Sequence, residues 1–207
     1  MLGKRIVLLI ILAISVYHLN AQEKNKLTVT LETGLLISPD FENLGLVLQL
    51  EPKLKINANS VIGLRYGFAI NSRAIKNYNS FEYNTDGESF SSVISITPTF
   101  DYYFYKNQSS FNPYLGAGLG YYVLKDMEIS RPVINTDADV FNGSIKNQFG
   151  FLIRSGFETG KLRLSLEYNF IPKAEINISN GDVVGAINDS YFGITLGLII
   201  GGGKRSK

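Results

Sequence analysis

The residue types that most often carry catalysis are scarce in this chain. Its 207 residues include one histidine and no cysteine. The histidine, His18, lies in an apolar N-terminal segment that we expect to be removed on export. A serine nucleophile needs a neighbouring base near neutral pH, and zinc sites are built mainly from His and Cys. The sequence therefore predicts a protein that is not an enzyme and that binds no metal ion or cofactor.

Two short motifs resemble ligand sites without matching them. The glycines at alternate positions of 116–120 lack the spacing of a dinucleotide-binding loop, because Tyr121 stands where the third glycine is needed. The acidic stretch 137–143 has no glutamate at the distance that closes a calcium loop. We interpret the first as strand glycines and the second as a solvated turn. The Tyr and Asn residues of 77–84 suit a contact surface and a solvated loop equally well, and the sequence leaves both open.

The dominant pattern of the chain is an alternation of apolar and polar residues with a period of two. In the segment 162–170, apolar residues at even positions alternate with Arg163, Ser165, Glu167 and Asn169. Successive side chains of a strand point to opposite faces, so this segment has one apolar and one polar face. The pattern predicts β-strands rather than helices.

The same alternation predicts eight strands, at about 27–37, 45–56, 60–72, 90–105, 113–124, 147–158, 161–171 and 190–201. Most are long enough to cross a bilayer when tilted, which takes about 9–11 residues. Three connections are short, at 57–59, 106–112 and 159–160; the first outer loop, 38–44, is also brief. Three are long, at 73–89, 125–146 and 172–189. Short turns at one end and long loops at the other are typical of outer-membrane barrels.

We expect the apolar face of this barrel to point outward into lipid. Glycines recur on the polar face, where the interior of a small barrel has little volume to fill. Aromatic residues gather near the strand ends, as in the girdles of membrane barrels. The sequence therefore predicts an all-β, eight-stranded, antiparallel up-and-down transmembrane β-barrel.

Two prolines fall inside predicted strands, where each removes a hydrogen bond from the ladder. They are Pro52 and Pro98. A closed barrel has no free edge to accommodate them. We expect a bulge or a locally broken pairing at each.

The predicted inward face carries ten charged residues that form a candidate ion network in the lumen. They are Glu32, Glu51, Lys53, Lys55, Arg65, Asp101, Arg154, Glu158, Arg163 and Glu167. Five acids and five bases are hard to reconcile with a selective channel, in which rings of one sign select the ion. Because an isolated buried ion is costly, we expect these residues to pair across strands and to plug the lumen.

The N-terminus has the features of a secretory signal peptide. Lys4 and Arg5 precede the apolar run 6–16, and Ala21 offers a small residue for cleavage. We therefore divide the chain into a cleaved signal peptide, 1–21, and a barrel domain, 22–207. Loss of Lys4 and Arg5 leaves 18 Lys and Arg against 18 Asp and Glu. A neutral protein gives no electrostatic support for nucleic-acid binding.

Three stretches of the chain resemble the outer-membrane-protein β-barrel (porin-family) domains of Bacteroidetes, which are similar in form to small OmpA/OmpX-type barrels. These stretches are 112–121, 157–162 and 191–198. The resemblance implies a location in the Gram-negative outer membrane and insertion by the barrel-insertion machinery. Gly193, Leu196 and Leu198 have the spacing of the C-terminal insertion signal, although the chain ends in a polar tail rather than a terminal Phe.

These observations identify the architecture better than the role. We expect a structural or surface-interaction protein whose partners are the lipid bilayer, the insertion machinery and a ligand or protein bound through the outer loops 73–89 and 125–146. A narrow pore for solute uptake and an accessory subunit of an export or surface-assembly machine remain open alternatives.

Overall fold

The computed structural model describes residues 27–39, 44–72, 75–77, 90–104, 111–131, 139–178 and 181–201. The predicted signal peptide 1–21, the polar tail after residue 201 and the segment 78–89 lie outside these ranges. No helix in the described part of the chain is both long and apolar enough to cross a membrane.

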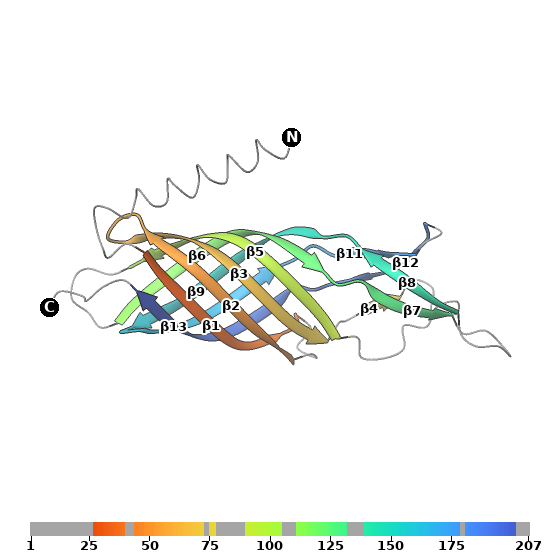
Figure 1. The fold of residues 1–207 in the computed structure, drawn as a ribbon, viewed down its shortest axis with the longest axis horizontal. Helices are drawn as coiled ribbons and strands as arrows, with labels where there is room; N and C mark the ends of the chain where they lie inside the picture. Colours follow the sequence, from red (N-terminus) through yellow and green to blue (C-terminus); the bar gives the residue numbers. More distant parts are fainter. Residues whose placement is uncertain are drawn as a thin grey trace, which may run out of the picture.

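Eight antiparallel strands close into a barrel, as the alternation predicts (Figure 1). They are β1 (Leu27–Ile37), β2 (Leu44–Lys55), β3 (Ser60–Ser72), β5 (Phe90–Tyr103), β6 (Phe111–Leu124), β9 (Gln148–Thr159), β10 (Leu162–Phe170) and β13 (Tyr191–Gly201). Each strand pairs with the next barrel strand along the chain, and β13 pairs with β1 to close the wall. The predicted up-and-down topology is confirmed.

The barrel is apolar outside and polar inside. On β10 the side chains of Arg163 and Glu167 are buried in the interior, whereas Leu162 and Leu166 are 46% and 53% exposed. The other barrel strands show the same alternation. A soluble barrel would bury its apolar face, so this orientation requires lipid around the wall. The fold is that of a transmembrane barrel.

The pairing of the strands is interrupted beside both prolines, and the register is unchanged. The β2–β3 ladder pairs Leu50 with Tyr66 and resumes at Lys53 with Gly63, which leaves Pro52 unpaired on that side. The β5–β6 ladder is broken in the same way at Pro98. A proline has no N–H to donate to the ladder on the side where its ring lies. On the opposite side, pairing is normal: β1 pairs with β2 through Pro52, and β3 pairs with β5 through Pro98. Of the two outcomes expected, broken pairing is correct and a bulge is not.

Five further strands extend the barrel at its long-loop end, where the sequence predicts loops. They are β4 (Ile75–Asn77), β7 (Met127–Arg131), β8 (Asp139–Ile145), β11 (Ala174–Asn177) and β12 (Val183–Ile187). They form one sheet in the order β4-β12-β11-β8-β7, which projects beyond the barrel mouth (Figure 1). We call this sheet the extension. The interpretation of 73–89, 125–146 and 172–189 as loops throughout is therefore wrong.

The extension is a prolongation of one side of the barrel wall. The β6–β9 ladder pairs Tyr122 with Gln148, and the β7–β8 ladder resumes in the same register with Met127 opposite Gly143. The β9–β10 register likewise continues from β9 and β10 into β8 and β11. The breaks between the two parts, at 125–126, 146–147 and 171–173, are only two or three residues long.

The polarity of the two faces inverts where the wall passes from the barrel into the extension. On β11, Ala174 and Ile176 are buried while Glu175 is exposed. This apolar-in, polar-out pattern is the one that suits water outside the sheet. The extension thus has its own apolar core, which is continuous with apolar side chains at the barrel mouth.

Candidate functional site: the barrel interior and the extension

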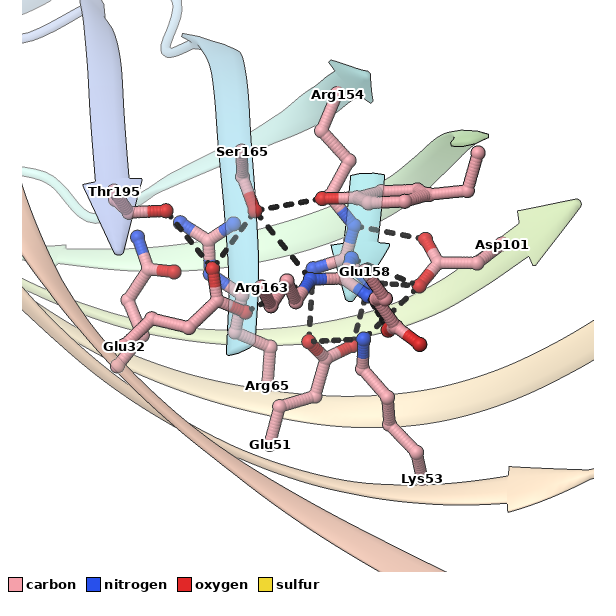
Figure 2. A network of polar contacts seen from close by, with 12 residues as sticks. Glu32, Glu51, Lys53, Arg65, Asp101, Arg154, Glu158, Arg163, Ser165 and Thr195 are labelled. Carbon is pink, nitrogen blue, oxygen red and sulfur yellow. Dashed lines mark hydrogen bonds and ion pairs between the residues drawn. The ribbon is translucent and has the colours of Figure 1, made fainter. Parts of the chain in front are cut away.

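The structure places nine of the ten predicted lumen charges inside the barrel. These nine are buried and lie on six strands; they are Glu32, Glu51, Lys53, Arg65, Asp101, Arg154, Glu158, Arg163 and Glu167. Figure 2 labels all of them except Glu167. Lys55 is instead exposed at the last position of β2, beyond the packed interior. The buried set therefore contains five carboxylates and four cations, not five of each.

Arg154 and Arg163 lie on the neighbouring strands β9 and β10, and both bind carboxylates from across the lumen. The Arg154 guanidinium donates to Glu51 at 2.7 and 2.8 Å and to Asp101 at 2.9 and 3.0 Å. Lys53 adds a second cation to the same pair of acids, with Nζ 3.1 Å from Asp101 and 3.5 Å from Glu51. The group links β2, β5 and β9 across the interior.

Arg163 is the hub of the network. Its nitrogens lie 2.6 Å from Glu158, 3.0 Å from Asp101 and 3.2 Å from Glu32. Its guanidinium carbon also lies 3.8 Å from the centre of the Tyr114 ring, which is a cation–π distance. Through Glu32 the network reaches β1, the first strand of the barrel.

A second ion pair lies closer to the long-loop end. Arg65 makes two hydrogen bonds of 2.7 Å to Glu167, a bidentate arrangement that fixes both side chains. Gln49 donates to the same carboxylate at 2.8 Å and Asn169 at 3.1 Å. Tyr122 in turn donates to Asn169 at 3.0 Å. The buried charged residues and their hydrogen-bonding partners thus form a polar layer, which ends where the interior becomes apolar.

Inward glycines provide the room for these side chains. A Cβ built on Gly193 would lie 2.8 Å from Cγ of Glu167, and one on Gly63 would lie 2.5 Å from Oε1 of Glu51. A methyl group at Gly116 would meet the Asp101 carboxylate. The alternation predicts glycines on the inward face, and in the structure these three accommodate Glu167, Glu51 and Asp101.

Apolar side chains close the long-loop end of the interior. The buried cluster joins inward residues of the barrel strands to residues of the extension. It comprises Leu36, Val47, Ala69, Val93, Tyr122, Leu124, Ile145, Ile171, Ala174, Ile176, Ile178, Val184, Ile187 and Tyr191. The polar layer is therefore covered on this side by a packed apolar layer. Sequence reasoning missed this layer, although inward aliphatic residues at the strand ends were its signal.

Sequence reasoning also missed the neutral partners of the network. Tyr103 donates to Glu158 at 2.6 Å, and Tyr114 donates to Ser165 at 2.6 Å. The hydroxyls of Ser165 and Thr195 both donate to Glu32 at 2.8 Å. Their position on the inward face could be read from the alternation, but their contacts depend on the shape of the lumen.

The predicted insertion signal lies on β13, the strand that closes the barrel against β1. Gly193 faces the interior, whereas Leu196 and Leu198 are 57% and 53% exposed on the lipid side. A strand in this place completes the barrel only by pairing with β1. Recognition of these three residues during insertion stays a prediction.

Comparison with solved structures identifies the same architecture. The outer membrane protein OprG from Pseudomonas aeruginosa is 15% identical, with a TM-score of 0.54 over 86% of this chain and 98% of that one. A major outer membrane protein from Thermus thermophilus is 13% identical, with a TM-score of 0.51 over 86% of this chain and 99% of that one. The fold is that of the small outer-membrane barrels. No family model and no curated protein matches the sequence.

Proposed function

We propose that the protein is an outer-membrane barrel with a structural or surface-interaction role, carried by the extension rather than by a pore. In this proposal residues 1–21 direct export, the insertion machinery places the barrel in the membrane, and the extension stands on the cell surface. The proposal includes no catalytic activity, because after removal of the leader no histidine or cysteine remains.

The observation that carries the proposal is the filled interior. Arg65 and Arg163, the largest fully buried side chains, lie in the polar layer, and each is bonded to carboxylates. The apolar layer then covers the long-loop side. In an eight-stranded barrel the interior is just wide enough for side chains to fill. An ion would have to displace both layers to pass.

Recording from planar bilayers tests this point. The purified protein should give no steady open level, because neither layer offers a water-filled path. Large, stable and ion-selective conductance would overturn the proposal and favour the pore.

The surface location of the extension can be tested separately. The sequence has no cysteine, so a single introduced thiol reports one position without background. Glu175→Cys, exposed on β11, should react with a membrane-impermeant maleimide on intact cells. Lys161→Cys, exposed in the short turn at the other end, should react only after the outer membrane is opened. The reverse pattern would place the extension in the periplasm.

A photo-reactive residue at position 175 then tests for a partner. If the extension binds a partner on the cell surface, cross-linking on intact cells should capture that partner from position 175 and not from position 161. Capture from neither position would leave the structural role and remove the interaction role.

A further inference from the structure

The strand ladders are interrupted at one level of the wall, where the barrel passes into the extension. The breaks 125–126 and 146–147 separate β6 from β7 and β8 from β9. The breaks 171–173 and 188–190 separate β10 from β11 and β12 from β13. Because β6, β9, β10 and β13 are neighbours in the barrel, the four breaks form a continuous line across this side of the wall. We call this line the joint.

The strands also reverse their faces at the joint. Residues 125 and 126 are both exposed, and so are residues 146 and 147. In a regular strand, successive side chains would point to opposite faces. Between β10–β13 and β11–β12, the register changes by one residue as well. The joint is therefore a discontinuity of the sheet, although two of its three ladders resume in register beyond it.

Side chains rather than ladder bonds bridge the joint. Asn147 Oδ1 accepts a hydrogen bond of 3.2 Å from the last backbone N–H of β6, and Asp126 Oδ1 accepts one of 2.8 Å from the last backbone N–H of β8. The Ser190 hydroxyl accepts from the backbone N–H of Ile171 at 3.0 Å and donates to the carbonyl of the same residue at 2.9 Å. In the described ladders, no paired residue falls within the four breaks. A few side-chain contacts thus replace a continuous ladder.

On the opposite side of the mouth, the extension meets the barrel through apolar side chains. Among the described strands, neither β1 nor β2 continues into the extension. Their inward residues Leu36 and Val47 belong to the same buried cluster as Ile176 of β11 and Ile187 of β12. Because separating these groups exposes apolar surface to water, the closed arrangement is the stable one. A sheet that is jointed along one line and packed elsewhere by apolar contact has the construction of a hinged cap.

We propose that the extension is a cap that opens and closes over the barrel mouth as one unit, with the joint as its hinge. Asp126, Asn147 and Ser190 are the contacts that resist bending of this hinge. Parts of a protein that lack continuous ladder bonds open more easily than the rest, and they do so as cooperative units. The barrel, whose ladders close on themselves, stays folded while the cap opens. The movement requires neither a partner nor a particular side of the membrane, so it is independent of the proposed function.

Thiol labelling of the full-length protein in lipid vesicles tests the inference. The chain has no cysteine, so single thiols can be introduced at positions that are 0% exposed. Leu36→Cys reports on the mouth, Ile176→Cys on the extension and Ser165→Cys on the polar layer. When reclosing is faster than labelling, the rate with a maleimide follows the population of the open form. Positions 36 and 176 should react at the same rate, and position 165 at least about tenfold more slowly.

Weakening the joint should speed the opening of the cap alone. Asp126→Ala/Asn147→Ala removes two hydrogen bonds and should raise the rates at positions 36 and 176 roughly tenfold, with no change at position 165. The matched control is Asn142→Ala/Glu175→Ala, which removes an amide and a carboxylate from the exposed face of the extension. This control should change none of the three rates.

Three results would overturn the inference. Equal rates at all three positions would mean that the extension opens only together with the barrel. Faster labelling at position 176 than at position 36 would mean that the extension frays strand by strand. Unchanged rates in the joint variant would mean that the joint is not the hinge. Heat-modifiable gel migration shows that each variant is folded; if the double variant fails to fold, Ser190→Ala, which removes both bonds to Ile171, takes its place with the same expected result.

Discussion

Replacement of Arg163 by methionine tests whether the interior of the barrel is dry. The Arg163 side chain is 0% exposed and lies within 3.2 Å of three carboxylates. Methionine fills part of the same volume but cannot pair with any of them. The three acids are affected unequally. Asp101 keeps Lys53 and Arg154, whereas Glu32 and Glu158 each lose the one ion pair they make among the described residues.

The size of the effect follows from that inequality. Removing one partner of a dry ion pair costs about 3–5 kcal/mol, because the other charge stays buried without compensation. Glu158 keeps the Tyr103 hydroxyl, and Glu32 keeps two hydroxyl donors. These contacts favour the lower part of the range, so we expect Arg163→Met to lower the free energy of unfolding by about 3 kcal/mol. The double variant Arg163→Met/Glu32→Gln should recover part of this loss, because it removes one of the two uncompensated charges.

Urea titration in lipid vesicles gives the measurement, with tyrosine fluorescence as the signal because the chain has 12 tyrosines and no tryptophan. Lys161→Met is the control: Lys161 is exposed in the adjacent turn, and its loss should change stability by no more than about 0.5 kcal/mol. If Arg163→Met cost under about 1 kcal/mol, water would reach the network and the filled interior would be refuted.

Three further changes probe the wall, the interior and the extension. Leu166→Arg puts a charge on the lipid face near the middle of β10 and should cost about 2–4 kcal/mol in the same titration, against under about 1.5 kcal/mol for Leu166→Met. Gly193→Ala forces a methyl group to within 2.8 Å of Glu167 and should cost about 1–3 kcal/mol; a neutral result would mean that the interior has spare volume. Deletion of 174–187 removes part of the apolar layer and should lower the temperature of unfolding, seen as earlier loss of heat-modifiable gel migration, whereas deletion of 128–142 should leave it nearly unchanged.

The eight barrel strands could be predicted because lipid and a narrow interior impose a strict period of two. In 162–170 the interior accepts polar side chains and the outside accepts only apolar ones, so the polarity of each residue indicates its face. The two prolines were informative for another reason, because a proline has no N–H to donate to the ladder. The pairing is broken beside Pro52 and Pro98 without a shift of register.

The extension could not be predicted because its strands are short and its polarity is inverted. β11 has four residues, and its apolar residues, Ala174 and Ile176, face inward rather than outward. A few residues later, Gly181 adopts a φ of 92°, a conformation typical of turns. Short strands with turn residues between them look like loops in a sequence. Their pairing becomes visible only through the register that they continue from the barrel.

The pairing within the lumen depends on information that alternation does not contain. The sequence assigns Lys53 and Lys55 to the same face, yet Lys53 is 3% exposed and bonded to Asp101 while Lys55 is exposed. The difference is one of depth along the strand, since β2 ends at Lys55 and the packed interior ends before it. Which acid meets which base is likewise set by the tilt and closure of the barrel, so Arg154 reaches Glu51 over 103 positions of sequence.

The inversion of polarity along one continuous wall also explains why the interior is ionic rather than apolar. Buried ion pairs are a weaker source of stability than an apolar core of the same volume. However, a strand that is apolar on both faces would contain a continuous apolar run, like a membrane-spanning helix. The alternation of polar and apolar residues prevents any long run of this kind after residue 22. On the barrel side of the inversion, lipid covers the apolar face and the lumen holds charges such as Arg65 and Glu167. On the extension side, water covers the polar face and the interior is an apolar core that includes Ile176. The level of the inversion is thus fixed by the change of solvent, which is why we place the membrane surface there.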